Sequence, residues 1–91
     1  AIVPAYYVVK HPSSLSFVEA AAIWMQYMTA YGALIDIAAI KKGDFVVIPA
    51  ASSSVGLAAI QLCKLVEAIP IATTRTNAKR QALQEAGAAY V

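Results

Sequence analysis

Small and hydroxyl-bearing residues follow a strongly apolar run near the middle of the chain. The segment Ala51-Ser52-Ser53-Ser54-Val55-Gly56 lies between the apolar run Phe45 to Ile48 and a helical pattern without breakers from Leu57 to Val66. A turn that leads from a strand into a helix favours phosphate binding, because the first helical amides are free and the helix dipole is positive there. Small side chains let a pyrophosphate approach the backbone, and serine hydroxyls add hydrogen bonds. We therefore expect a phosphate-binding turn at this place.

The turn departs from the glycine-rich fingerprint G-x-G-x-x-G of dinucleotide-binding domains. Ala51 and Ser53 stand where the first two glycines would be, and only Gly56 remains. The alternative interpretation is a serine-rich helix cap that binds no ligand, since serine is a favoured cap residue in any helix. The position between strand and helix favours the phosphate-binding turn over this alternative.

A second polar group stands where the next apolar run ends. Dinucleotide-binding domains carry an Asp or Glu at this point, about 20 residues beyond the turn, to bind the ribose hydroxyls of NAD. Here Thr73, Thr74, Arg75 and Thr76 follow one another, and Lys79 comes shortly after. No acid is present to repel a 2′-phosphate, whereas Arg can bind one with two parallel hydrogen bonds and Lys can add a point charge. The sequence therefore favours NADP(H) over NAD(H); the alternative is a solvated helix start.

The elements that must position these groups can be located by their boundary signals. Ser16 to Glu19 fits a capping box, which predicts a helix from Phe17 to about Ala39, closed by Lys42-Gly43-Asp44. This helix is apolar on nearly every face, so we expect it to be buried on several sides, with Trp24, Tyr27 and Tyr31 in the core. The run Phe45 to Ile48 is typical of a strand buried on both faces of a parallel sheet.

The second half of the chain repeats the alternation of strand and helix. Ile69 to Thr73 predicts a second strand, and Thr76 or Asn77 can cap a third helix that runs to Ala86 and ends at Gly87. Residues 88 to 91 begin a third strand. The predicted fold is α/β, namely the first half of a doubly wound parallel Rossmann sheet (β-α-β-α-β) preceded by a long helix. We assign residues 16–91 to a partial dinucleotide-binding domain and residues 1–15 to a connection leading into it.

Composition narrows the function classes. Of the 91 residues, 60% are hydrophobic and 13% charged, so the apolar surface exceeds what such a short chain can bury. The scattered net charge of +2 argues against nucleic-acid binding. One cysteine and one histidine exclude a disulfide framework and a zinc site within this segment, and favour a reducing, cytoplasmic setting. No signal peptide is visible, and the uncharged stretch 20 to 35 is short for a membrane span. A membrane or protein-interaction module remains the alternative of another class.

Five short segments, in a single order, form a pattern that covers nearly the whole chain. They are Leu15-Ser16 with Glu19-Ala20-Ala21, Thr29-Ala30-Tyr31-Gly32, Gly43-Asp44-Phe45-Val46, Ala50 to Gly56, and Thr74-Arg75-Thr76 with Lys79. This combination resembles the medium-chain dehydrogenase/reductase superfamily, particularly its quinone-oxidoreductase-like and zinc-type alcohol-dehydrogenase-like members. Glu67-Ala68 departs from the Gly-Ala of the family, so we expect the turn after the second helix to be rebuilt.

The resemblance implies an NADP(H)-dependent enzyme that transfers a hydride between NADPH and a carbonyl, quinone or activated alkene. Implied cofactor-binding residues are Ser53, Ser54, Val55 and Gly56 at the pyrophosphate, Thr74, Arg75, Thr76 and Lys79 at the 2′-phosphate, and Thr29 toward the nicotinamide end. No catalytic or metal-binding residue can be named in this segment.

The rest of the family architecture is expected outside this chain. A GroES-like catalytic domain would precede residue 15, with Tyr6 to Lys10 as its last strand. We therefore expect an inactive fragment that works with a small-molecule substrate, with the remainder of the same enzyme and as a homo-oligomer. A zinc-dependent alcohol dehydrogenase is the alternative within the family.

Overall fold

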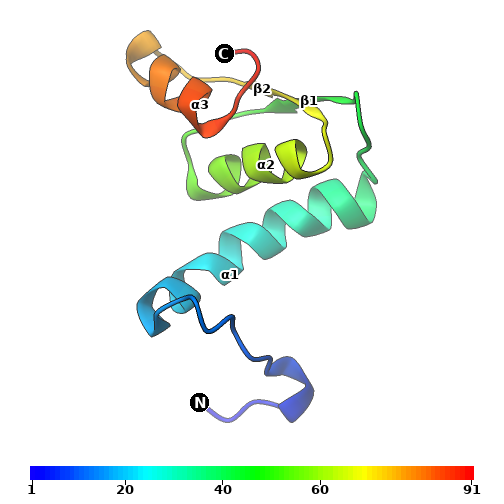
Figure 1. Cartoon of the computed structure of the whole chain (residues 1–91), viewed down its shortest axis with the longest axis vertical. Helices are drawn as coiled ribbons and strands as arrows, with labels where there is room; N and C mark the ends of the chain where they lie inside the picture. The colour runs from blue at the N-terminus through cyan, green and yellow to red at the C-terminus, as the bar shows by residue number, and fades with distance from the viewer.

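Two parallel strands joined by a helix form the centre of the computed structural model, which describes residues 1–91 (Figure 1). Strand β1 (Phe45–Ile48) pairs with β2 (Ile69–Ala72), with Phe45 opposite Ile69 and Ile48 opposite Ala72. Helix α2 (Ser54–Leu65) provides the crossover that parallel strands require. The expected strands and the parallel sheet are therefore confirmed.

The C-terminal residues add the start of a third strand on the other side of β2. Ile71 forms a single parallel bridge with Tyr90, and the Ala72 N–H donates to the Tyr90 carbonyl over 2.8 Å. Pro70 has no N–H to give to this side, but its carbonyl accepts from the Ala89 N–H over 2.9 Å. The sheet thus has β2 between β1 and the C-terminal residues, which is the arrangement expected for the first half of a doubly wound sheet.

Helix α1 (Phe17–Tyr31) begins with the predicted capping box and crosses beneath α2 (Figure 1). The Ser16 N–H donates to Glu19 Oε2 over 2.8 Å, and the Glu19 N–H donates to Ser16 Oγ over 3.2 Å. Hydrogen bonds from the backbone and side chain of Ser16 lower the pKa of the Glu19 carboxyl. Beyond Tyr31 the helical path widens into a π-helical segment, Gly32–Ile37, so the predicted end at Ala39 is two residues too late.

The predicted role of Gly43 as the end of the first helix is wrong. The path leaves the helix at Ala39, which adopts a positive φ of 48°. Gly43 instead belongs to a separate turn before β1, in which the Asp44 carboxylate accepts the Lys41 N–H over 2.9 Å and pairs with the Lys41 ammonium at 3.1 Å. These contacts with Lys41 lower the pKa of Asp44.

The core is small and rich in alanine, and lies between α2, the sheet and α3 (Arg80–Ala86). Its fully buried larger side chains are Ile60, Leu83 and Cys63. Two expectations about burial are wrong for this chain. Helix α1 buries only Ala20 and Ala30. Strand β1 leaves Phe45 66% and Val47 63% exposed, because no element covers that face of the sheet.

Helices α2 and α3 end in the same kind of turn, although only one of them has glycine there. Gly87 has φ +116°, as predicted, and the Ala88 N–H donates to the Leu83 carbonyl over 3.0 Å. At the end of α2, Glu67 takes the left-handed position with φ +59°, and the Ala68 N–H donates to the Cys63 carbonyl over 2.8 Å. The expected rebuilding of this turn is therefore wrong. A non-glycine residue in this conformation costs roughly 1 kcal/mol or more, and the exposed Glu67 side chain forms an ion pair with Lys42.

Residues 1–15 lie below the start of α1 (Figure 1). The strand expected at Tyr6 to Lys10 does not form. Instead, Ala5–Tyr7 make a 3-10 turn and the following residues have no strand partner. His11 is half-buried, and its ring and the Phe17 ring meet edge to face at a centroid distance of 5.5 Å. None of the helices combines the length and apolar character that a membrane crossing requires.

The third helix begins later than its capping signals suggest. Thr76 stands at the start of a 3-10 turn, Asn77–Lys79, without a side-chain cap, and α3 begins only at Arg80. Its end at Ala86 agrees with the prediction. Because α3 starts late, Lys79 belongs to the connection between β2 and α3. This connection faces the turn before α2, so Lys79 can contact that turn.

Candidate functional site

The two sequence groups expected to bind a dinucleotide meet at the carboxyl ends of β1 and β2. The Thr73 N–H donates to the Ile48 carbonyl over 3.0 Å, and the Ala51 N–H donates to the Thr73 carbonyl over 3.2 Å. These two bonds fix the turn before α2 against the residues that follow β2. Ligands of open α/β sheets bind in this region, outside the carboxyl ends of the strands.

An open pocket of about 560 Å³ lies between the two groups. It is lined by Ala50, Ser52, Thr73, Thr74, Arg75, Thr76 and Lys79. All four residues predicted for the 2′-phosphate therefore line the same pocket. The Lys79 ammonium donates to Ser52 Oγ over 3.1 Å, a contact between residues 27 positions apart. This contact directly links the serine turn to the basic segment.

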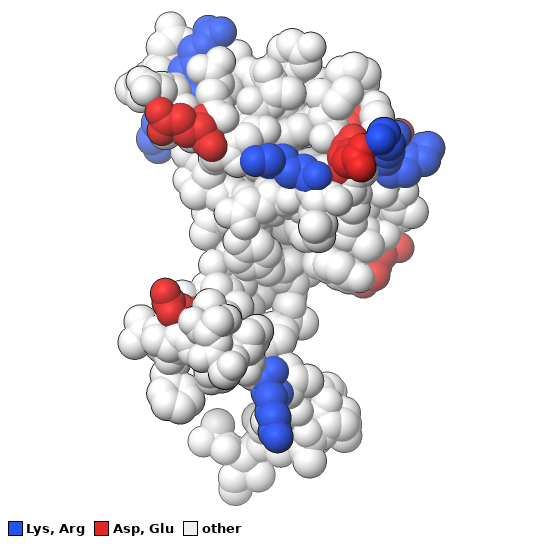
Figure 2. Space-filling model, in the orientation of Figure 1, with Lys and Arg blue, Asp and Glu red and all other residues white.

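The pocket is basic and has no acid to neutralise it. The chain's two ion pairs join Lys41 to Asp44 and Lys42 to Glu67, so Arg75 and Lys79 have no carboxylate within pairing distance. Figure 2 shows that Lys, Arg, Asp and Glu gather on the upper body, while the face over the middle of α1 carries almost none. An unpaired guanidinium and an ammonium in one open pocket favour a phosphate ligand.

The first turn of α2 combines the two interpretations that the sequence left open. Ser53 is the N-cap, and its Oγ accepts the Gly56 N–H over 3.1 Å, so the capping alternative is correct for this serine. Ser54 and Val55, the first two helical residues, donate their N–H groups to no acceptor of the chain. The helix start thus keeps two free amides for an anion, even with its cap in place.

Gly56 lets the start of α2 approach the preceding backbone more closely than any other residue could. A Cβ at this position would lie 2.6 Å from the Ala51 carbonyl oxygen and 2.7 Å from its Cα. Both are backbone atoms that cannot rotate away. This is the role of the third glycine in the dinucleotide fingerprint, namely close packing of helix on strand. The structure therefore explains why this glycine is present although the other two are replaced.

Thr29 does not join the basic pocket. Its Oγ1 donates to the Met25 carbonyl over 2.6 Å, and it lines a separate hollow of about 250 Å³ between α1 and the turn, together with Ser53, Val55 and Gly56. The exposed Ser54 lines neither hollow. The predicted residues therefore divide into two groups around one turn, with Thr29 on the α1 side and Arg75 and Lys79 on the other.

Sequence reasoning missed Ala50, Ser52 and Thr73 as lining residues. Ser52 and Thr73 are hydroxyl residues within the two groups already recognised, so their type was an available signal. Ala50 takes a positive φ of 48°, and its alanine side chain gives no sign of that conformation. Which of three consecutive serines meets Lys79 depends on the path of the turn, and only the structure shows it.

The remaining reactive groups offer no catalytic or metal centre within the chain. No three His, Cys, Asp or Glu side chains come together in a way that could hold a metal ion. Burial raises the pKa of the Cys63 thiol, so the side chain stays neutral and behaves as a small apolar group.

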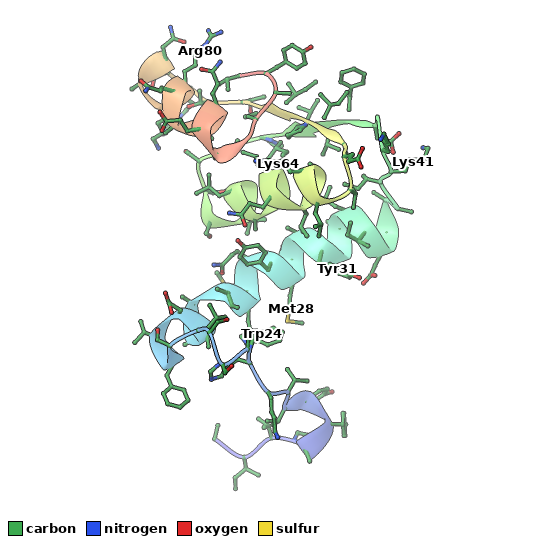
Figure 3. All side chains as sticks on the ribbon, viewed as in Figure 1. Trp24, Met28, Tyr31, Lys41, Lys64 and Arg80 are labelled. Atoms are coloured by element: carbon green, nitrogen blue, oxygen red, sulfur yellow. The ribbon has the colours of Figure 1, made fainter.

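A third hollow, apolar and of about 440 Å³, lies along α1, where the sequence predicted core residues. Trp24, Met28 and Tyr31 line it, and Trp24 and Met28 lie on the lower side of α1 in Figure 3, away from the sheet. Trp24 is 44% and Tyr31 49% exposed, so the prediction that they are core residues is wrong for this chain. Tyr27 also lines the hollow, and its hydroxyl donates to the Gln61 side-chain carbonyl.

Comparisons with known sequences find relatives that match most of the chain. No family model matches the chain. It is 38% identical over 79 residues to the human synaptic vesicle membrane protein VAT-1 homolog, covering 87% of the chain and 20% of that protein. It is 46% identical over 76 residues to a reducing polyketide synthase of Hypomyces subiculosus, covering 84% of the chain and 3% of that protein. The chain thus spans a fifth or less of these curated relatives.

Solved structures give the same result. The CurK enoyl reductase superposes with a TM-score of 0.87 at 35% identity, over 97% of the chain and 26% of that structure. A Bacillus thuringiensis protein described as an NADPH:quinone reductase superposes with a TM-score of 0.90 at 29% identity, over 98% of the chain and 27% of that structure.

Strand order, crossover helix and glycine-supported turn define the class as a Rossmann-type α/β segment. The similar proteins share one superfamily: the homologues and solved structures that match this segment are medium-chain dehydrogenases/reductases, each matched over only part of its length.

Proposed function

We propose that the chain is the NADP(H)-binding segment of an oxidoreductase that transfers a hydride between NADPH and a carbonyl, quinone or activated alkene. Similar structures include an enoyl reductase and a protein described as an NADPH:quinone reductase, which supports this substrate range. When bound, the nicotinamide supplies or accepts the hydride. The residues of this chain bind and orient the adenosine and pyrophosphate part.

The assignment of residues follows the two sides of the turn. Ser54 and Val55 would offer free amides to the pyrophosphate, and Gly56 would keep the start of α2 close to the preceding backbone, so that these amides are held at the turn. Arg75 and Lys79 would bind the 2′-phosphate, supported by the hydroxyls of Thr74 and Thr76, which line the same pocket. All four of these residues line the basic pocket. Thr29, on the α1 side, would face the nicotinamide end.

One observation carries the proposal: the Lys79 ammonium donates to Ser52 Oγ in a basic pocket without a paired acid. An NAD-specific site needs an acid that accepts hydrogen bonds from the ribose hydroxyls. This pocket offers only donors with positive charge and neutral hydroxyls. A ribose that carries a phosphate satisfies them better than one that carries a hydroxyl.

The test compares two adenosine ligands that differ only in that phosphate. Isothermal titration of the chain with adenosine 2′,5′-bisphosphate and with 5′-AMP should give about tenfold or more tighter binding of the bisphosphate, a minimum for two charge-assisted contacts. The double variant Arg75→Ala and Lys79→Ala should remove the preference. The matched control, Lys10→Ala with Lys64→Ala, removes the same charge outside the pocket and should keep it. Equal affinities of the unmodified chain would refute the proposal.

Ionic strength supplies an independent check. The preference rests on charges at an open pocket, so added salt should reduce the affinity for the bisphosphate more than that for 5′-AMP. A preference that does not change with salt would indicate recognition of shape rather than charge.

A further inference from the structure

We infer that Ser52 is a positioning residue for Lys79, and that it sets part of the discrimination between NADP and NAD. The inference rests on the proposed function and adds a residue to it. The observation behind it is the 3.1 Å hydrogen bond from the Lys79 ammonium to Ser52 Oγ.

The two partners differ in how firmly the fold holds them. Ser52 directly follows Ala51, which is completely buried and whose N–H donates to the Thr73 carbonyl over 3.2 Å. Lys79 is exposed, ends a three-residue 3-10 turn and carries a long flexible side chain. The serine is therefore the fixed partner, and the lysine is the one whose freedom the bond restricts.

Of the three consecutive serines, only Ser52 is available for this role. The Ser53 Oγ is occupied by the Gly56 N–H at the helix cap, and Ser54 lines neither hollow. Ser52 lines the basic pocket together with Lys79. Which of the three serines contacts Lys79 therefore depends on the path of the turn and not on residue type.

The bond leaves both groups able to bind a phosphate. Ser52 Oγ accepts a hydrogen bond from one ammonium N–H, so its own hydroxyl hydrogen stays free to donate. The ammonium keeps two further N–H donors. No carboxylate competes for these N–H donors, because the two ion pairs of the chain involve Lys41 and Lys42. The pair thus presents three donors at one place before any ligand arrives.

The expected size of the effect follows from the cost of ordering a lysine. Immobilising one flexible side chain on binding weakens affinity by roughly three- to tenfold, and an ordered Lys79 avoids part of that loss. Removing the Ser52 hydroxyl should therefore weaken binding of a 2′-phosphate by about that factor. A ligand without the 2′-phosphate does not use Lys79 and should be unaffected.

The experiment uses adenosine 2′,5′-bisphosphate and 5′-AMP as probes, titrated into Ser52→Ala, Ser52→Thr and the control Ser14→Ala. We expect Ser52→Ala to lose about three- to tenfold for the bisphosphate alone. Ser52→Thr, which retains a hydroxyl, and Ser14→Ala should behave like the unmodified chain. In a Lys79→Ala background, Ser52→Ala should cause a smaller loss than in the unmodified chain, because the lysine it positions is gone and only the direct contact of its hydroxyl with the phosphate remains to be lost.

The outcomes separate this inference from the proposed function. If the unmodified chain binds both ligands equally, the proposed function fails and the role of Ser52 fails with it. If the unmodified chain prefers the bisphosphate but Ser52→Ala keeps that preference, only the role of Ser52 is refuted. A loss of the same size for both ligands would show that Ser52 merely supports the turn, and would also overturn the inference.

Discussion

Replacing Gly56 by alanine tests whether close packing of α2 on the preceding backbone holds the turn together. The added Cβ would meet three backbone atoms of Ala51, at 2.6 Å, 2.7 Å and 2.8 Å. Real Cβ atoms do not approach other heavy atoms so closely, so α2 or the turn has to move. Because Ala51 is fully buried, the movement also disturbs the core beside it.

The expected loss of stability is the difference between two opposing effects. Overpacking of this kind costs about 1 to 3 kcal/mol, and backbone contacts place it near the upper end of that range. Alanine in a helix is more favourable than glycine by about 1 kcal/mol, which offsets part of the cost. The net destabilisation is therefore about 2 kcal/mol. With a urea dependence of about 1 kcal/mol per molar for a small protein, the midpoint should fall by about 2 M.

Urea unfolding followed by far-ultraviolet circular dichroism measures this shift, and Gly32 provides the matched control. Gly32 has helical angles, φ −57° and ψ −44°, and a Cβ built there has nothing within 4 Å. Gly32→Ala should therefore stabilise the chain by about 0.5 to 1 kcal/mol. A Gly56→Ala variant as stable as the unmodified chain, or stabilised like Gly32→Ala, would refute the packing argument.

Two further predictions concern the helix start and the open sheet. Ser16→Ala keeps the backbone N–H that lowers the pKa of Glu19 most, but it removes the hydrogen bonds of the Ser16 side chain, one of which also lowers that pKa, so the variant should be less stable at neutral pH. A carboxyl with a lowered folded-state pKa adds stability above its unfolded pKa and loses it as the pH falls through the folded value. The stability difference in urea should thus shrink at acidic pH, and a constant difference would contradict this. Strand β1 is an edge strand with an exposed face, and Val47→Lys places a charge on that face. The variant should therefore self-associate less than the unmodified chain, as measured by light scattering. Undiminished scattering would argue against association through this face.

Local signals predicted the boundaries of most elements. The Ser16 and Glu19 capping box is specified by two residues three positions apart, and the structure contains it. Gly87 ends α3 for an equally local reason, because glycine accepts a left-handed conformation without strain. The prediction that Gly43 ends the first helix is wrong, because glycine is common in turns as well as at helix ends. The helical path that continues α1 through Gly32–Ile37 is left at Ala39, which takes the positive φ although it is not a glycine.

Burial could not be predicted in the same way, because it depends on what lies across from a residue. The sequence of β1 indicated two buried faces, yet Phe45 and Val47 are exposed where no element covers the sheet. Trp24 and Tyr31 have the spacing of core residues and lie in an open hollow along α1. Apolar periodicity predicts which helix and strand faces are suited to burial. Only the tertiary structure shows which of these faces are covered by another element of the chain.

The sequence alone determined the chemical character of the candidate site: a turn of small residues, a retained glycine, and a basic segment without an acid. Residue type decides charge and size, so these properties do not depend on the fold. The tertiary structure decided which groups meet. It placed Thr29 on one side of the turn and Lys79 on the other, and joined Lys79 to Ser52 rather than to either neighbouring serine. That choice depends on the path of the backbone through Ala50 and Ala51, which hydrogen bonds to the end of β2 hold in place.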